Sequence, residues 1–480
     1  MTHPPSPTAG RLTGNLGTTS IVLMVVAAAA PLTVLGGNVP LMVGLGTGVG
    51  APVGFVVATT VMLLFAIGFV NMTPFVREAG AFYAYVAKGL GFAPGIGTGF
   101  LALLAYTCMQ VGMYGYMGAV MSNVVADVTS VQIPWWVYAL ATLAVIAFLG
   151  YRHIELSSKV LGIALIGEVG VVMVLDLAIL LTGGESGLNL QSFAPSNALS
   201  GPVGVAVLFA LTGFIGFEST AVFRNEARDP DRTLPRATYI AVLGIGGFYL
   251  ISAWLMVLGY GVDSVVDKAQ SDTDNFLFNL VDTYLGTVGR DIVQVLIITS
   301  IFACLLALHN VVARYQFALS RYRFMPSALG RVHDVHRSPH ISSLPQSATA
   351  LVLTVIAAAL GLQPLTQVFA TLGGIATIGM ITLMTVTSIA ALRFFRTSPS
   401  CTKPWQHRIA PGLAALGLLG SLVLVLVNFQ LVTGFGLTVA VILAVIPFLV
   451  FAAGTVVGAG ERRSGSDLDA ADLSATGSEQ

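Results

Sequence analysis

The sequence predicts an all-α integral membrane protein with twelve transmembrane helices. Apolar residues occupy 55% of its 480 positions and charged residues only 9%, whereas about 25% of the residues in an average soluble domain are charged. Mean hydropathy is +0.86. The formal net charge is zero, so the chain lacks the basic surface that binds nucleic-acid phosphates. This composition excludes a soluble enzyme, a disordered chain and a nucleic-acid-binding protein.

Twelve apolar runs are candidates to cross the hydrocarbon core, which takes about 20 residues of helix. Each run is expected to be helical, because an open strand in lipid leaves its backbone polar groups unpaired. The division between the ninth and tenth runs depends on the stretch 361–364. The runs lie near 19–45, 50–71, 93–123, 134–150, 156–182, 201–224, 236–260, 289–319, 345–362, 365–393, 408–431 and 434–458.

Lysine and arginine set the orientation, because they are enriched in cytoplasmic loops. With twelve spans and a cytoplasmic N-terminus, all 22 lysines and arginines except Lys268 and Arg290 fall on the cytoplasmic side. We therefore expect a multi-pass protein of the inner (cytoplasmic) membrane, surrounded by lipid, with both termini cytoplasmic and no cleaved leader. The external segment 261–291 is acidic. It is interpreted as a solvated loop, although its aspartates could also attract cations.

The predicted spans group into two blocks. Residues 18–182 and 200–396 contain five spans each, and because five is odd the second block must be inverted relative to the first. Residues 408–458 add two further helices. Residues 1–17 and 459–480 have the composition of disordered cytoplasmic ends.

Two predicted spans contain helix-breaking residues at corresponding places in the two blocks. The first reads A-A-A-A-P-L-T-V-L-G-G-N-V-P over 27–40, where proline removes a backbone donor and glycine weakens the next turn. The sixth reads L-T-G-F-I-G-F-E-S-T over 211–220. Kinks that serve packing are one explanation. Paired broken helices in inverted halves, however, are typical of a transporter binding site.

Several longer stretches of the chain also have the character of sequence motifs. They are F-I-G-F-E-S-T at 214–220, N-E-A-R-D-P-D-R-T-L-P-R-A at 225–237, N-V-V-A-R-Y-Q-F-A-L-S-R at 310–321 with L-G-R-V-H at 329–333, and E-A-G-A-F-Y-A-Y-V-A-K-G-L-G at 78–91. Together they resemble the amino acid–polyamine–organocation permease superfamily. The resemblance implies a LeuT-type 5+5 inverted repeat with two extra C-terminal helices and secondary transport of amino acids or related amines. Many members have a G-S-G-type sequence where this chain has 30–33.

The substrate site is expected at the two breaks. Half-helix N–H groups suit a substrate carboxylate, carbonyl groups suit an ammonium, and glycine permits close approach. In the third span, Tyr106, Gln110 and Tyr114 recur at helical spacing and form one polar stripe. This stripe lines the cavity or makes interhelical hydrogen bonds. The substrate-binding candidates are Ala30, Pro31, Leu32, Thr33, Gly213, Phe214, Gly216, Phe217, Tyr106 and Gln110.

Ionisable residues inside the membrane are costly, so they are functional hypotheses by default. Glu218 directly matches the family's glutamate after the sixth-span break. Glu168 lies roughly 18 Å into the fifth span, where some proton-coupled members are thought to have a lysine. It could transfer the coupling proton or make a structural hydrogen bond.

Asp176 is a weaker candidate. Sodium, the alternative ion, would need oxygen ligands such as Thr299 and Ser300, whose hydroxyls can also bond within the helix.

No cofactor or metal is expected. His333, His336 and His340 lie in a loop that matches the family without implying zinc. No Walker motif indicates an ATP-driven pump, and no paired nucleophile and base indicates an enzyme. The predicted function is secondary active transport of an amino acid by alternating access, coupled to protons. The alternatives are an amine or polyamine exchanger, a channel, and a substrate-sensing receptor without net flux.

Overall fold

The computed structural model describes residues 17–76, 82–152, 158–218, 227–321, 324–330, 340–397 and 403–463. Within these ranges the chain is helical and has no β-strand. Eleven of its helical stretches are long and apolar enough to cross a membrane, and each overlaps a predicted span. In the described part of the remaining predicted span, the sixth, the apolar helix is a short one, Val203–Thr212. The all-helical membrane class is confirmed, whereas the count of twelve and the inverted repeat stay predictions.

The principal helices are, in chain order, α1 (Thr18–Ala28), α4 (Pro52–Met72), α5 (Phe82–Leu90), α6 (Phe92–Thr129), α7 (Trp135–Arg152), α8 (Ser158–Thr182), α10 (Val203–Thr212), α12 (Pro230–Tyr260), α13 (Val265–Ser271), α14 (Phe276–Arg321), α15 (His340–Ala359), α16 (Ala370–Thr397), α17 (Ala410–Thr433) and α18 (Leu437–Arg463). Short helical turns lie between them: α2 (Pro31–Thr33), η1 (Val34–Asn38), α3 (Val39–Met42), η2 (Val43–Thr47), η3 (Gly48–Gly50), η4 (Thr73–Phe75), η5 (Gln191–Phe193), α9 (Pro195–Ala198), η7 (Ser327–Gly330), η8 (Pro364–Phe369) and η9 (Trp405–Ile409).

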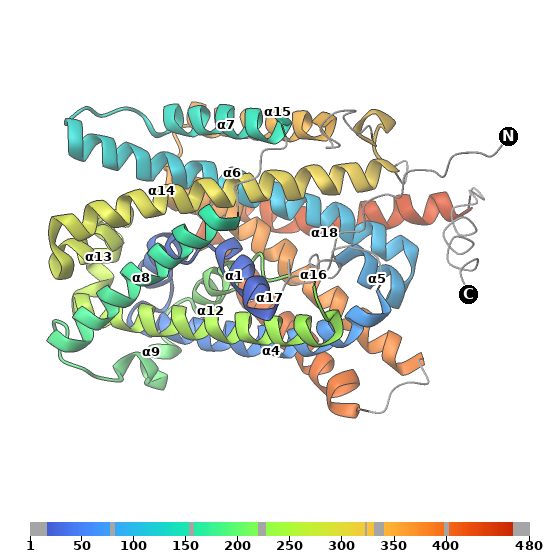
Figure 1. Ribbon diagram of the computed structural model, residues 1–480, viewed down its shortest axis with the longest axis horizontal. Helices are drawn as coiled ribbons and strands as arrows, with labels where there is room; N and C mark the ends of the chain where they lie inside the picture. The colour runs from blue at the N-terminus through green and yellow to red at the C-terminus, as the bar shows by residue number, and fades with distance from the viewer. Residues whose placement is uncertain are drawn as a thin grey trace.

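Helices far apart in sequence pack side by side. The two longest described helices, α6 and α14, contact each other next to the edge where α7 packs against α15, and α4 packs against α12 on the opposite side (Figure 1). The stretch Pro364–Thr397, which contains α16, is 83% buried in its most apolar part, against 22% for Leu437–Gly460. Peripheral helices can expose leucine and valine, because lipid tails are as apolar as those side chains.

The acidic segment 261–291 is largely helical, so the interpretation as a solvated loop was wrong. It forms α13 and the start of α14, which changes direction at Gly286, where φ is 69°. Val265, Ala269, Phe276 and Leu280 are at most 1% exposed. These apolar residues recur at helical spacing and anchor the segment, while the interspersed aspartates hid that spacing in the sequence.

Close packing explains the glycine pair of the first span. Gly36 and Gly37 lie in η1, a π-helical turn. A Cβ atom on Gly36 would stand 2.6 Å from the hydroxyl oxygen of Tyr116 in α6, which is closer than real Cβ contacts allow. Glycine therefore lets the first span lie directly against the Tyr116 side chain of α6.

Some predictions fall outside the described residues. They include His333, His336 and the motif stretches 78–81 and 219–226. Most of the predicted disordered ends also lie outside them. The C-terminal boundary needs correction, because α18 continues to Arg463 rather than ending near 458.

Candidate functional site

The first break separates α1 from α2. Ala30 between them has φ 47°, a left-handed conformation that costs a non-glycine residue about 1–2 kcal/mol. The helix restarts at Pro31, which has no N–H group to leave unpaired in a first turn. The Ala29 carbonyl has lost its place in a regular helix and instead accepts a hydrogen bond from the Tyr249 hydroxyl of α12 at 3.2 Å. The break is thus a supported feature of the fold.

Glu168 lies against this break. Its side chain extends from α8 and is 4% exposed. Its Oε2 accepts a hydrogen bond from the Ser300 hydroxyl at 2.9 Å and lies 3.5 Å from the Leu32 backbone nitrogen, a long distance for a hydrogen bond. The Thr33 hydroxyl donates to Ser300 at 3.3 Å. Glu168 therefore joins α8, α14 and the restarted helix, whose N-terminal end favours negative charge.

The second break follows α10, which ends at Thr212. Residues 213–218 form turns, and Gly216 has φ 108°, a value suited to glycine. The Glu218 carboxylate accepts a hydrogen bond from the Gly216 N–H at 2.9 Å and another from the Tyr106 hydroxyl of α6. Glu218 therefore fastens the unwound backbone to α6.

The two breaks are adjacent. A Cβ atom on Gly213 would lie 3.1 Å from Val34 Cγ1 and 3.2 Å from Tyr249 Cε2. The Tyr249 ring also makes an edge contact with Phe214, with ring centroids 6.4 Å apart. Tyr249 thus touches both breaks, and sequence reasoning missed it. The available signal was a tyrosine in the middle of an apolar span, since a buried tyrosine hydroxyl usually has a hydrogen-bond partner.

Gln110 belongs to a different cluster. Its side chain is fully buried, and its Nε2 lies 3.3 Å from the Tyr114 hydroxyl and 3.3 Å from His309 Nδ1. Its Oε1 accepts a hydrogen bond from Gln346 Nε2 at 2.5 Å. These bonds link α6, α14 and α15, which supports the interhelical alternative for this part of the stripe. His309 and Gln346 were missed because nothing in the sequence pairs them with Gln110.

The hydroxyls considered for sodium do not converge. Thr299 is exposed and donates to the Leu296 carbonyl within its own helix at 2.8 Å, while Ser300 bonds Glu168. Asp176 lies further along α8 than Glu168 and accepts a hydrogen bond from Ser252 of α12 at 2.6 Å. Its position gives it a role in joining α8 to α12.

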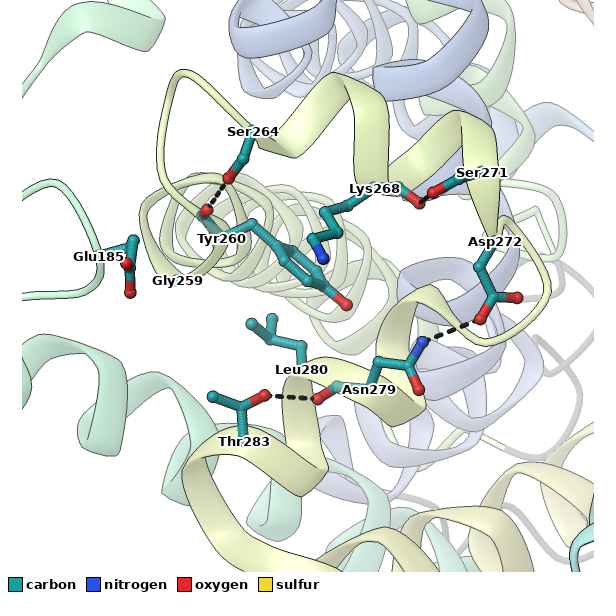
Figure 2. A pocket seen from close by; sticks show the side chains of 10 residues that line it. All are labelled: Glu185, Gly259, Tyr260, Ser264, Lys268, Ser271, Asp272, Asn279, Leu280 and Thr283. Carbon is teal, nitrogen blue, oxygen red and sulfur yellow. Dashed lines mark hydrogen bonds between the residues drawn. The ribbon is translucent and has the colours of Figure 1, made fainter.

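A separate cavity of about 450 Å³ lies between the end of α12, α13 and the start of α14 (Figure 2). We call it the α13 cavity. It does not include residues of either break, and its lining residues are Glu185, Gly259, Tyr260, Ser264, Lys268, Ser271, Asp272, Asn279, Leu280 and Thr283.

Comparison with known proteins agrees with this architecture. Residues 16–451 match the family described as amino acid permease. The chain is 24% identical to the branched-chain amino acid permease BcaP of Bacillus subtilis over 82% of this chain and 84% of that protein. It is 24% identical to the low-affinity putrescine importer PlaP of Escherichia coli over 73% of this chain and 77% of that protein.

A third relative is the serine/threonine exchanger SteT of Bacillus subtilis, which is 24% identical over 58% of this chain. That match spans 63% of the exchanger, less than two thirds of its length. The named relatives are transporters rather than enzymes. This agrees with the prediction from the sequence that the chain is a transporter and not an enzyme. The family match covers most of the chain and accords with its many apolar helices, so this multi-pass membrane protein belongs to the amino acid permease family.

Proposed function

We propose that the chain is a secondary active transporter that moves amino acids across the cytoplasmic membrane by alternating access, coupled to protons, with both termini in the cytoplasm. The main support for coupling is Glu168, a buried carboxylate that contacts the first break and the Ser300 hydroxyl. Protonation removes its negative charge at the N-terminal end of the restarted helix. The attraction that holds this helix to α8 then weakens, so protonation and helix position are linked.

The substrate is proposed to bind between the two breaks. Both expose backbone polar groups at adjacent positions, and such groups at membrane depth are tolerated where they are buried or line a cavity. The residues proposed to surround it are Ala30, Pro31, Leu32, Thr33, Gly213, Phe214, Gly216, Phe217 and Tyr106. Gln110 contributes indirectly, because its hydrogen bonds to α14 and α15 fix the position of α6 behind these residues. Glu218 stabilises the conformation of the second break and is a further candidate for proton coupling.

Two relatives favour amino acids by name, and one favours an amine, putrescine. Amine exchange is therefore the second candidate function. Counterflow in proteoliposomes separates the candidates, because it needs no driving gradient. Vesicles are loaded with one unlabelled amino acid, or with putrescine, and uptake of the labelled compound is followed. Saturable accumulation of an amino acid supports the proposal. Accumulation of putrescine alone favours the amine exchanger, and no accumulation of any compound contradicts transport.

Glu168→Gln tests proton coupling. Glutamine keeps the size and hydrogen-bonding capacity of the side chain but does not titrate. We expect counterflow to persist, while accumulation driven by an inward proton gradient falls on the order of tenfold or more. Its dependence on pH should flatten. Both quantities are measured in the same vesicles, so loss of folding would be seen as loss of counterflow.

Asp176→Asn is the matched control. It changes a second carboxylate of α8, which bonds Ser252 rather than the first break. We expect this variant to keep gradient-driven accumulation. Normal accumulation by Glu168→Gln would remove Glu168 as the proton carrier, and loss of accumulation in Asp176→Asn alone would transfer that role to Asp176.

A further inference from the structure

The α13 cavity has firmly held walls. The Tyr260 hydroxyl donates to the Phe276 carbonyl at 2.5 Å, and the Tyr284 hydroxyl donates to the Gly259 carbonyl at 3.0 Å. These bonds fasten the end of α12 to the start of α14. Leu280 and Gly259 are buried in the wall. The volume of about 450 Å³ falls in the range of small-molecule sites.

Charges of both signs line the cavity. The amino group of Lys268 points toward its middle, with Glu185 and Asp272 on opposite sides (Figure 2). The Asp272 carboxylate accepts hydrogen bonds from Asn275 and Asn279, each at 3.0 Å. Lys268 has no carboxylate within 4.0 Å in the part of the chain that the structure describes. Its positive charge is therefore available to an anionic group that enters.

The polar lining also includes a helix end. α12 ends at Tyr260, and the C-terminal end of a helix has partial negative charge. This end and Glu185 lie together on one side of the cavity (Figure 2). One side therefore suits an ammonium group and the middle suits a carboxylate. That is the charge pattern of an α-amino acid zwitterion.

α13 connects the cavity to the first broken span. The Gln270 side chain, on the helix that bears Lys268, donates to the Gly44 carbonyl in η2 at 2.8 Å. A Cβ atom on Gly44 would lie 3.5 Å from the Ala269 backbone, so the two segments are in direct contact. A ligand that holds α13 in place therefore also stabilises this position of the first span.

We propose that the α13 cavity is a second binding site for α-amino acid zwitterions, distinct from the site between the breaks. Lys268 binds the carboxylate, and Glu185 binds the ammonium in the negative field at the end of α12. Occupancy favours the arrangement in which α13 contacts η2. The choice of amino acids as ligands rests on the proposed function, whereas the existence of a charged, Lys268-dependent site does not.

Equilibrium binding to the purified full chain in lipid nanodiscs tests the site. The probes are radiolabelled L-serine, L-leucine and putrescine. With an amino acid, we expect two molecules bound per chain in the unmodified protein and one in Lys268→Met. Lys268→Arg should restore the second, because it keeps the positive charge. Asp267→Asn is the control, since Asp267 is an exposed charge on α13 outside the cavity lining, and it should keep two.

Counterflow on the same preparations separates this proposal from the transport proposal. One amino acid per chain in the unmodified protein, or two that persist in both Lys268→Met and Glu185→Gln, overturns the second site and leaves transport standing. Lys268-dependent amino acid binding without counterflow supports the site and contradicts transport. Putrescine binding that needs Glu185 but not Lys268 overturns the assignment to zwitterions.

Discussion

Asp274 lies in the turn between α13 and α14, close to Asp272. Burial and the negative charge of Asp272 raise its pKa to about 6, above the value of about 3.9 for an unfolded aspartate. Folding therefore favours the protonated form. This stabilisation is complete below the unfolded pKa and is lost as the pH rises through the folded pKa. We expect Asp274→Asn to raise the thermal midpoint near neutral pH and to flatten its pH dependence between about pH 4 and 7.

Thermal unfolding of the detergent-solubilised protein measures this effect. Asp267→Asn removes the same charge from an exposed position on α13 and should change the midpoint little at any pH. Equal changes in the two variants would mean that the overall negative charge of the segment, rather than the buried position of Asp274, decides its stability.

The second break depends on one glycine. Gly216 has φ 108° and donates its N–H to Glu218 at 2.9 Å. An L side chain at such a backbone angle costs about 1–3 kcal/mol, so Gly216→Ala should move the turn and separate that N–H from the carboxylate. We expect counterflow to fall steeply while the thermal midpoint falls only modestly. Gly247→Ala in α12 is the control, because a Cβ atom there meets nothing within 4 Å. Normal counterflow by Gly216→Ala would show that the turn is not required.

At the level of elements, the sequence predicted the positions of both breaks, because proline and glycine act locally on backbone hydrogen bonding. It also placed Glu168 near mid-membrane from the regular rise of a helix, and that position stays a prediction. It did not predict α13, whose apolar spacing was masked by aspartates. It also missed Tyr249, His309 and Gln346. Their importance comes from partners on other helices, and a single sequence does not state which helices will meet.

The helix arrangement of the whole molecule could not be read from hydropathy. The stretch Leu437–Gly460 is more apolar than Pro364–Thr397, yet 22% of the first is buried against 83% of the second. Lipid and protein interior are equally apolar, so no hydrophobic difference sends one helix to the centre. Glycine content does not separate the two stretches either, because Gly373, Gly374 and Gly379 lie in the buried one and Gly454, Gly458 and Gly460 in the other.

The orientation of the whole molecule in the membrane can be tested by cysteine labelling. The native cysteines Cys108, Cys304 and Cys401 are first replaced by serine. Asp267→Cys on α13 and Thr397→Cys at the end of α16 then provide single exposed sites. Between them the chain runs through α14, α15 and α16, each long and apolar enough to span. An odd number of crossings puts the two sites on opposite sides of the membrane.

A membrane-impermeant maleimide should label Asp267→Cys in intact cells and Thr397→Cys only after permeabilisation. The predicted twelve-span topology puts nearly all lysines and arginines on the Thr397 side, and such residues mark the cytoplasm. The reverse pattern would keep the helix count between the sites but invert the protein, and would place the α13 cavity on the cytoplasmic side. Labelling of both sites from the same side would show that one of the three helices does not cross. The inverted five-span repeat would then fail, because its second half needs all of them.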